Sequence, residues 1–310
     1  MTDTTIALAG TAGDLGGRIA NALVARGATV RALVRPHAAE ADLDRVTATG
    51  AVPVLVDQTD VGAVAEAVAG AACVVSALSG LRDVVLDRQS VLLDSAVRAG
   101  VPRFVPSDYA SDFTRTEPGH NRNFDLRREF WGRADRASIA VTSVLSGAFM
   151  ELLDGDMPVL QRRVRRVLHW GDPDQLLDFT TKDDVAAATA AVALDPKTPR
   201  VLRFAGDSLS ARDLARVMTD LTGHRWRTLR VGSARSLDVV GAVLKRVAPE
   251  PGEVFSAWQG IAYSRDMFSG EAQLQPLDND RYPELAWTSV RDFLQTLAPL
   301  ARDSGHTDER

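Results

Sequence analysis

Three glycines that follow the first apolar run constrain the fold of this chain more than any other feature. The predicted strand 6–10 ends at Gly10, Gly13 and Gly16 come next, and a helical pattern begins within this loop. A helix that opens on such a loop leaves its first backbone N–H groups free to bind an anion. The first glycine permits a tight turn, the second lets the backbone approach a diphosphate, and the third lets the helix pack closely against the strand.

The position of this loop, between the first strand and the first helix, favours dinucleotide binding over a purely structural glycine turn. Arg35, at the end of the second strand, favours NADPH, because a guanidinium pairs with the 2′-phosphate whereas an acidic residue would bind the ribose of NAD. A plain surface role for Arg35 is the alternative. Asp57 is placed to reach the adenine or to cap the next helix. The predicted cofactor-binding residues are Gly10, Thr11, Ala12, Gly13, Asp14, Leu15, Gly16, Arg35, Asp57, Ala77, Leu78, Ser107 and Arg127.

Over the first 150 residues, short β-branched runs alternate with helical patterns, which is typical of a parallel sheet with crossover helices. Since the strands are apolar throughout, we expect all of them to be buried on both faces. The predicted fold class is α/β, a Rossmann doubly wound parallel sheet with a smaller C-terminal substrate region. The predicted strands are 6–10, 29–34, 52–56, 73–78, 103–106 and 139–145, and the predicted helices include 15–26, one capped by Asp60, and 84–98.

Beyond residue 150 the pattern loosens, and the chain is expected to turn to shaping a substrate site. Helices are predicted at 183–194 and at 210–222, the second with Ser210 as its N-cap and Gly223 as its stop, and 201–205 is expected to form a seventh strand. The predicted domains are a nucleotide-binding domain over 1–155, completed by about 176–206, and a mainly substrate-binding or cap region over 156–310, with a disordered tail at about 304–310.

Charge and cysteine content exclude several classes of function. The formal net charge of −5 argues against binding of nucleic acid through its phosphates. The arginines at 162, 163, 165 and 166 are an exception, and we interpret them as a solvated helix face or a substrate-facing lid rather than a membrane or nucleic-acid surface. Cys73, the single cysteine, reads as buried packing, and no export signal or long apolar span is present, so a cytoplasmic protein is expected. The five histidines show no metal-binding spacing, and no metal is predicted.

Several segments together resemble the NmrA-like, isoflavone-reductase-like branch of the atypical short-chain dehydrogenases. Besides the glycine loop and Arg35, the landmarks are the segments 101–109, 143–149, 179–186 and 204–206, of which 103–109 is the most specific. The resemblance runs through nearly the whole chain. It implies a Rossmann fold with a smaller C-terminal substrate region, a preference for NADPH, and a cleft between the two parts.

Three departures from the patterns of related enzymes stand out, of which the last two bear on chemistry. Thr11 and Ala12 are exchanged relative to the usual loop, which preserves the glycine spacing. Arg127 stands where reductases of the isoflavone type carry a lysine, and a guanidinium does not readily pass a proton, although it can hold the nicotinamide ribose or stabilise an oxyanion. The Tyr-x-x-x-Lys pair is also absent, because Phe113 follows Tyr109 four residues later. The candidate catalytic residues are therefore Arg127 and Tyr109, and a structural or pocket-wall role is the alternative for Tyr109.

The leading functional hypothesis is an NADPH-dependent reductase that transfers a hydride to a small apolar or aromatic carbonyl, enone, quinone or imine. The predicted substrate pocket consists of Tyr109, Phe149, Met150 and Trp170, with ordinary core packing as the alternative for each. One rival is a non-catalytic NADP(H)-binding redox sensor that reports to a protein partner, and another is a biosynthetic enzyme with a non-redox step. The expected partners are a small-molecule substrate and either a second copy of the chain or a regulatory protein.

Overall fold

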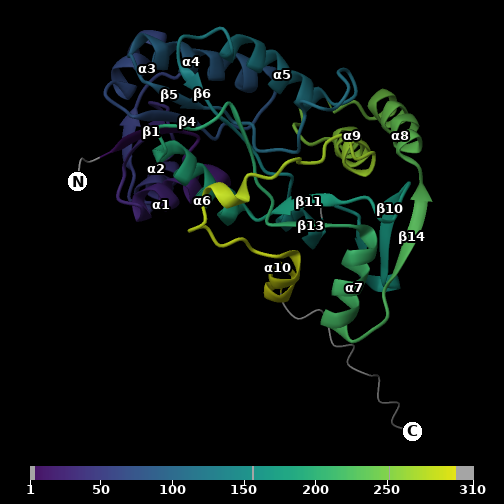
Figure 1. The fold of residues 1–310 in the computed structure, drawn as a ribbon. Helices are drawn as coiled ribbons and strands as arrows, with labels where there is room; N and C mark the ends of the chain where they lie inside the picture. Colours follow the sequence, from purple (N-terminus) through teal and green to yellow (C-terminus); the bar gives the residue numbers. More distant parts are fainter. Residues whose placement is uncertain (1–3, 156, 251, 298–310) are drawn as a thin grey trace.

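The computed structural model of the protein describes residues 4–155, 157–250 and 252–297. Its N-terminal half is built on a six-stranded sheet in the order β3-β2-β1-β4-β5-β6, with every neighbouring pair parallel (Figure 1). This is the strand order of a doubly wound dinucleotide-binding sheet, so the predicted fold class is confirmed. The strands are β1 (Thr5–Ala9), β2 (Thr29–Val34), β3 (Val52–Leu55), β4 (Cys73–Ser76), β5 (Arg103–Val105) and β6 (Ala140–Val141).

Helices cover both faces of this sheet. On one face α1 (Asp14–Ala25) packs against α6 (Lys182–Leu194), and on the other lie α3 (Val61–Val68), α4 (Gln89–Arg98) and α5 (Arg122–Ala134) (Figure 1). Successive residues of β1 face opposite layers: Ile6 and Leu8 join the apolar cluster beneath α1 and α6, whereas Ala7 and Ala9 join the cluster on the other side. The sheet is thus the middle of three layers.

The expected helix boundaries hold where a side chain caps the helix. The Asp60 carboxylate accepts hydrogen bonds from the backbone N–H groups of Gly62 (2.7 Å) and Ala63 (3.2 Å), so its predicted capping role is confirmed. Ser210 forms a capping box at the start of α7 (Ala211–Thr222), and Gly223 ends that helix with a φ of 70°. Both of these predictions are confirmed as well.

Two expectations about the sheet half were wrong in part, and one helix was not predicted. Not every strand is buried on both faces: Val52 and Leu55 of β3 are 54% and 58% exposed, because β3 is an edge strand paired only with β2. The helix expected over 84–98 is preceded by a π-helical turn, Asp83–Arg88, before α4 begins. The helix α2 (Glu40–Ala48) has a single buried residue, Val46, so apolar periodicity did not reveal it.

The strand expected over 139–145 is divided at Thr142. The part before it, β6, pairs with β5, and the part after it, β7 (Ser143–Leu145), leaves the main sheet to pair with β12 (Val201–Arg203). The Thr142 hydroxyl bonds the Thr198 hydroxyl at 2.6 Å, beside this change of partner. Thr142 and Ser143, two polar residues inside an apolar run, therefore mark the change of partner. The predicted seventh strand is confirmed as β12, the partner of β7.

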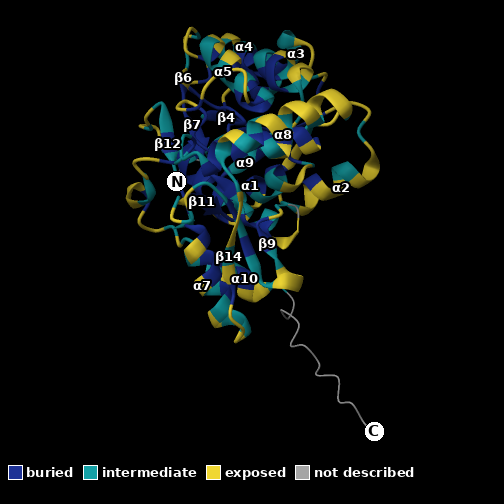
Figure 2. Cartoon of the chain, turned by 90° about the vertical axis from the view of Figure 1, so that its right-hand side faces the viewer, coloured by how far each residue is buried: buried dark blue, intermediate teal, exposed yellow. Residues whose placement is uncertain are grey.

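The C-terminal half consists of small sheets and helices. One sheet has the order β14-β10-β9 and another β13-β11-β8, and α7, α8, α9 and α10 lie around them (Figure 1). In Figure 2 much of α8 is exposed, whereas β11 lies in the buried interior. The elements are β8 (Ala148–Phe149), β9 (Leu160–Gln161), β10 (Arg166–Trp170), β11 (Leu177–Thr180), β13 (Asp207–Leu209), β14 (Arg227–Gly232), α8 (Ala234–Val247), α9 (Ala257–Phe268), α10 (Val290–Thr296) and short 3-10 turns at Met150–Asp154, Arg162–Val164 and Asn279–Arg281.

Four further expectations concern particular segments. The arginines at 162–166 do not lie on an α-helix, because the chain forms a 3-10 turn over Arg162–Val164 and then enters β10. Cys73 is buried and free, as expected, and burial raises the pKa of its thiol to about 12. In the part of the chain that the structure describes, no helix has the length and apolar character needed to span a bilayer. The tail predicted at about 304–310 lies outside the described residues.

Candidate functional site

The glycine loop sits at the carboxyl end of β1, and steric crowding requires two of its three glycines. Gly10 has a φ of +90°, and a Cβ there would lie 2.6 Å from the carbonyl oxygen of Ala77 at the end of β4. A Cβ on Gly16 would overlap the carbonyl group of Gly10. Backbone atoms cannot easily move aside, so both positions exclude any larger residue. Gly10 thereby brings β1 and β4 together, and Gly16 brings α1 against the loop.

Gly13 differs, because the protein itself does not need a glycine there. A Cβ at this position would meet only the carbonyl oxygen of Gly10, at 3.3 Å, and the φ of Gly13 is −81°. Gly13 is the N-cap of α1 without any side-chain capping bond, and the first bond of the helix runs from the Gly17 N–H to the Gly13 carbonyl (2.9 Å). The N–H groups of the first turn are thus left for a ligand. This cradle fits a diphosphate.

Charged side chains from two helices meet beside this cradle. The Asp14 carboxylate pairs with Arg18 and with Lys182, each at 2.7 Å, and Arg18 also pairs with Asp183. The bonds from Lys182 and Arg18 lower the pKa of Asp14 below its usual value. The Lys182 ammonium lies 5.9 Å from the centre of the Phe149 ring as well. The sequence assigned no role to Lys182 or Arg18.

At the end of β2, Arg35 is exposed, and none of the ion pairs among the described residues involves it. Asp57 follows β3, and its carboxylate accepts hydrogen bonds from the Thr59 N–H (2.9 Å) and the Thr59 hydroxyl (2.7 Å). These two bonds lower the pKa of Asp57. Gln58 donates to the Leu33 carbonyl at 2.9 Å and so ties the ends of β2 and β3 together. Arg35 is therefore available for a phosphate, while Asp57 already stabilises its own turn.

The carboxyl ends of β4 and β5 bring further predicted residues to the same end of the sheet as the glycine loop. The Ala77 N–H donates to the Ala9 carbonyl at 2.9 Å, which sets the start of the segment that contains Leu78 beside the glycine loop. The Ser107 N–H donates to the side-chain oxygen of Gln89 at 2.9 Å. Gln89 is almost fully buried, and its other amide atom donates to the Val85 carbonyl at 3.2 Å. Gln89 was missed, although a glutamine on a buried helix face was a usable signal.

A buried carboxylate lies behind the end of β5. Asp108 accepts hydrogen bonds from the Trp131 indole (2.5 Å) and the Ser143 hydroxyl (2.6 Å), and its second oxygen is buried without a partner. Burial raises its pKa above the usual value, while these hydrogen bonds and the nearby charges of Arg127 and Arg200 act in the opposite direction. Arg127 donates to the Asn123 carbonyl at 3.0 Å, and its Nε is buried with no hydrogen-bond acceptor. Arg127 thus carries a buried donor that a ligand or substrate can engage.

Tyr109 lies inside the apolar cluster between the sheet and α6. It is 8% exposed, and its hydroxyl is buried near Thr189 without a well-formed hydrogen bond. Burial raises the pKa of the phenol well above its usual value. This placement favours the structural role that the sequence left open for Tyr109 over proton donation.

The predicted substrate-pocket residues fall into two clusters. Phe149 packs against the cluster that contains Tyr109, whereas Met150 and Trp170 belong to a cluster in the C-terminal half. Trp170 contacts Phe268 of α9, with ring centroids 5.2 Å apart. Phe149 and Met150 are consecutive and face different clusters, so they join the two halves at this point. Their contact with a substrate stays a prediction.

Among the described residues, no group of three or more His, Cys, Asp or Glu side chains is arranged to hold a metal ion. The charged groups beside the glycine loop are instead arginine, lysine and single carboxylates. The site offers backbone N–H groups, cations and an apolar edge. These groups suit a phosphate-bearing organic cofactor.

Comparison with known proteins gives consistent matches. The model of the NmrA-like family matches residues 2–247. A bifunctional pinoresinol-lariciresinol reductase of Forsythia intermedia is 25% identical over 316 residues, which cover 95% of this chain and 99% of that protein. The solved structure of AtPrR2 with NADP+ and (+)-pinoresinol superposes with a TM-score of 0.78 at 23% identity, covering 95% of this chain and 99% of that one. A quinone oxidoreductase of Escherichia coli complexed with NADPH has a TM-score of 0.71 at 20% identity and covers 94% and 98% of the two chains.

Proposed function

This chain belongs to the NmrA-like family, and on that premise we propose that it is an NADPH-dependent reductase. Its substrate in this proposal is a small apolar or aromatic carbonyl, enone, quinone or imine. The nucleotide-binding unit comprises residues 1–155 with about 176–206, and residues 156–310 supply mainly the substrate region. The packing of α6 against α1 supports this division. Relatives that cover nearly the whole chain are named as reductases, which supports the reaction class.

The observation that carries the proposal is that Gly13 is much less crowded by protein atoms than the other two glycines of the loop, Gly10 and Gly16. Gly10 and Gly16 are required by contacts within the protein, whereas a Cβ on Gly13 would meet one protein atom within 4 Å, the Gly10 carbonyl oxygen at 3.3 Å. No contact within the protein requires a glycine at position 13, and the free N–H groups of the helix start lie next to it. The close approach of a diphosphate explains why a glycine stands there. The cofactor, when bound, supplies the hydride.

The preference for NADPH in this proposal rests on Arg35. Its guanidinium is exposed beyond the end of β2, and no acidic residue takes the place where NAD-binding folds hold the ribose hydroxyl groups. Arginine matches a phosphate with two parallel hydrogen bonds, and the positive charge attracts the 2′-phosphate.

Two cations serve the reaction in this proposal. Arg127 has a buried Nε without an acceptor, and its charge would stabilise the anion formed when the substrate is reduced, which would then take its proton from water. Lys182 neutralises Asp14, because an uncompensated carboxylate at the cradle would repel the diphosphate. The aromatic ring of Phe149, next to Lys182, forms part of the substrate wall.

The second candidate function is a non-catalytic NADP(H) sensor that acts through a protein partner. One observation favours it: the Tyr109 hydroxyl is buried in the core, and Arg127 replaces the lysine of the isoflavone-type pattern, so neither residue readily donates a proton. A sensor keeps the cofactor cradle but needs no proton donor.

Cofactor choice is tested by fluorescence titration of the Arg35→Ala variant with NADPH and NADH. We expect NADPH affinity to fall at least about tenfold, because a charge-assisted bond to the phosphate contributes about 1.5–3 kcal/mol, and NADH affinity to change little. The matched control is Arg26→Ala, which removes an equally exposed charge from the end of α1. Equal losses for both cofactors would contradict phosphate recognition by Arg35.

Reaction class is tested with a panel of quinones, enones and imines, scored by the loss of NADPH absorbance that accompanies its oxidation. Oxidation with any member supports the reductase, and Arg127→Met should then lower kcat more than it raises KM. Tight NADPH binding without oxidation by any member, together with NADPH-dependent capture of a protein, would favour the sensor instead.

A further inference from the structure

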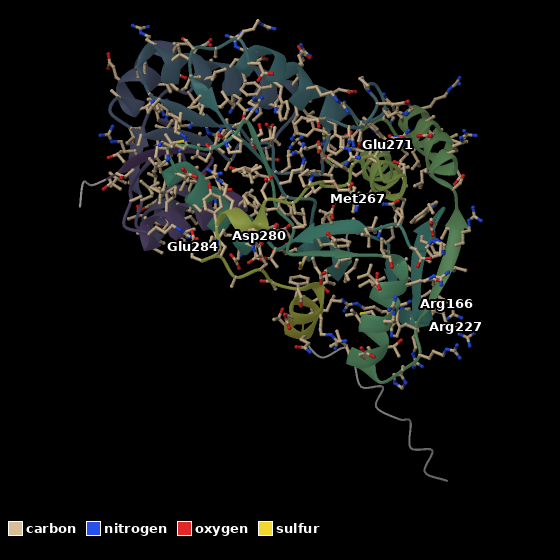
Figure 3. The ribbon with its side chains drawn as sticks, viewed as in Figure 1. Arg166, Arg227, Met267, Glu271, Asp280 and Glu284 are labelled. Carbon is tan, nitrogen blue, oxygen red and sulfur yellow. The ribbon has the colours of Figure 1, made fainter. Side chains whose placement is uncertain are left out.

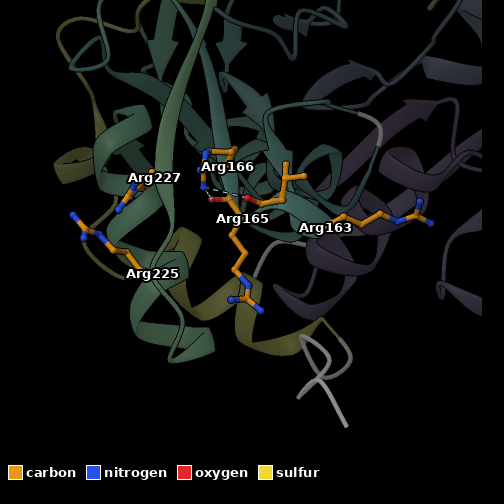
Figure 4. A pocket seen from close by; sticks show the side chains of 6 residues that line it. Arg163, Arg165, Arg166, Arg225 and Arg227 are labelled. Atoms are coloured by element: carbon orange, nitrogen blue, oxygen red, sulfur yellow. Dashed lines mark hydrogen bonds between the residues drawn. The ribbon is translucent and has the colours of Figure 1, made fainter. Parts of the chain in front are cut away.

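Five arginines line one cavity in the C-terminal half of the molecule. The cavity has a volume of about 330 Å³ and opens to solvent beside the sheet β14-β10-β9 (Figure 4). Arg166 and Arg227 lie at the opposite end of the molecule from α1 and the glycine loop, as Figures 1 and 3 show. The cavity is therefore separate from the proposed cofactor site. Its lining residues are Arg163, Val164, Arg165, Arg166, Arg225 and Arg227.

Strand pairing brings these arginines together from two distant segments. The strands β10 and β14 run parallel, with Arg166 opposite Arg227, and the Arg227 N–H donates to the Arg165 carbonyl at 3.3 Å. Trp226 is buried, and its indole donates to the Thr222 hydroxyl at 3.1 Å. Because side chains alternate along an extended chain, a buried Trp226 turns Arg225 and Arg227 outward on the same side. The cluster is thus built into the register of the sheet.

The backbone around the cavity is held in an unusual shape. Arg165 has φ 52° and ψ 53°, a left-handed conformation that only one other non-glycine residue adopts in the part of the chain that is described. The Arg166 guanidinium donates to the carbonyls of Val164 (3.2 Å) and Arg165 (3.1 Å) and so braces the corner. Left-handed arginine is unfavourable, and such positions concentrate at ligand sites.

Four of the five arginines that line the cavity form no ion pair with a described residue. Across residues 4–155, 157–250 and 252–297, no carboxylate forms a salt bridge with Arg163, Arg166, Arg225 or Arg227, whereas the neighbouring Arg162 pairs with Asp154 at 2.9 Å. The chain as a whole has more acidic residues than basic ones, 41 against 36. Mutual repulsion among arginines is costly, and a bound anion relieves it.

We propose that this cavity binds a compact polyanion with at least two phosphoryl groups. Guanidinium groups match phosphate oxygens with paired hydrogen bonds, and the volume lies at the lower end of small-molecule sites. In Figure 4 Arg225 and Arg227 lie on one side of the cavity and Arg165 lies beside them, while Arg163 points away. Arg225 and Arg227 therefore carry the proposed contacts with the ligand, and Arg166 holds the backbone of Val164 and Arg165 in place.

The lining distinguishes this ligand from larger anionic partners. The lining contains no aromatic side chain, so bases of single-stranded nucleic acid have nothing to stack on. Val164, 60% exposed, is its single apolar residue, which is too little to anchor the segment in a bilayer. The chemistry is that of phosphate recognition, either from free polyphosphate or from the phosphates of a nucleotide.

The test is calorimetric titration of the full chain with inorganic tripolyphosphate, at low salt and in the Gly13→Val background, in which the diphosphate cradle of the cofactor site is blocked. We expect saturable binding at one site that weakens as salt rises. The double variant Arg225→Gln/Arg227→Gln should lose at least about tenfold in affinity, since both residues supply charge-assisted bonds. The matched control, Arg235→Gln/Arg246→Gln, removes two exposed charges from α8 and should bind as the wild type does.

A second measurement separates binding from folding. Without tripolyphosphate, Arg225→Gln/Arg227→Gln should melt at the same or a higher temperature than wild type, because repulsion is removed, and its affinity for NADPH should be unchanged. Tripolyphosphate should raise the melting temperature of the wild type and not that of this variant. In the Gly13→Val background, ATP that binds as tightly as tripolyphosphate would assign recognition to the phosphates alone, and tighter ATP binding would point to a nucleotide ligand.

Three outcomes would overturn the proposal. The first is the absence of saturable binding of tripolyphosphate. The second is an equal loss of affinity in the two double variants, which would reduce the effect to overall charge. The third is binding to phosphatidylserine vesicles or to single-stranded DNA without binding to tripolyphosphate, which would make the cavity part of a surface for a larger anionic partner.

Discussion

The two halves of the molecule are held together by different interactions. The N-terminal half is held together mainly by parallel pairing between strands and by two apolar clusters, one on each face of the sheet. In the C-terminal half, carboxylates fasten distant segments by accepting backbone N–H groups: the buried Asp178 accepts from Leu274 at 2.7 Å, and Asp207 accepts from Val290 at 3.0 Å. Local periodicity therefore describes the first half well, whereas the second depends on single side chains that bridge nearly a hundred residues.

The largest expected effect on stability comes from a comparison of one glycine in each half, Gly16 and Gly260. Gly16→Ala should lower the free energy of unfolding by about 3 kcal/mol, because its Cβ overlaps the Gly10 carbonyl and only backbone could move aside. Gly260→Ala, inside α9 with no atom within 4 Å of the new Cβ, should raise it by about 0.5–1 kcal/mol. Urea denaturation of both variants measures the difference. Similar losses in the two would break the contrast.

Within the first half, Gly13→Val should separate binding from folding. The Cβ at this position meets a single protein atom at 3.3 Å, so the fold should survive, while the side chain fills the space of the diphosphate. NADPH and NADH should both lose about two to three orders of magnitude in affinity, since several charge-assisted bonds of about 1.5–3 kcal/mol are lost. Circular dichroism and cofactor titration check the two parts, and retained affinity would place the cofactor elsewhere.

A smaller effect is expected where the halves meet, at Lys182. Lys182→Met leaves Asp14 with Arg18 alone, and the freed negative charge should weaken NADPH binding by about 3–10-fold at low salt. Lys182→Arg should restore most of the affinity. Titrations at low and high salt test the cause, because an electrostatic effect shrinks as salt rises. A loss that salt does not change would indicate lost packing on Phe149 instead.

The smallest expected effect compares the halves by pH. Burial raises the pKa of Asp266, so the folded state holds a proton more tightly and this group costs stability as pH rises through the window above 3.8. Lys182 and Arg18 lower the pKa of Asp14, so that group adds stability above 3.8 and loses it as pH falls through its lowered value. Relative to wild type, Asp266→Asn should therefore gain stability as pH rises from about 4 to 7, whereas Asp14→Asn should lose stability as pH rises from about 3 to 4 and stay less stable above that. Urea midpoints across that range measure both trends, and trends of the same sign would contradict this assignment.

Most of the sheet half could be predicted from the sequence, because buried strands and capped helices leave local patterns. The partner change at Thr142 could not, since it depends on Arg200, whose carbonyl accepts the Ser143 N–H. The helix α2 was missed because it buries one residue, and the exposure of β3 was misjudged because edge position depends on the order of the whole sheet. Local pattern thus predicts elements better than it predicts their neighbours.

The parts of the candidate site that lie in one short segment could likewise be predicted from the sequence, and the parts assembled by tertiary contacts could not. The glycine loop was readable because its chemistry lies in seven consecutive residues. Lys182 was not, because its partner Asp14 is 168 residues away, and the sequence showed the arginines at 162–166 without Arg225 and Arg227, which only the pairing of β10 with β14 brings to them. Residues that act through tertiary contacts leave no local signal.

The packing of α6 against α1 also sets the order in which the protein can mature during translation. A nascent chain that has emerged as far as residue 155 contains all six strands of the main sheet, but it lacks Val185, Ala188 and Val192, which bury one face of that sheet. Until those residues leave the ribosome, Ile6 and Leu8 have no helix α6 above them, and an apolar surface is open to chaperones. The first half of the protein therefore completes its folding only after synthesis has passed the end of α6.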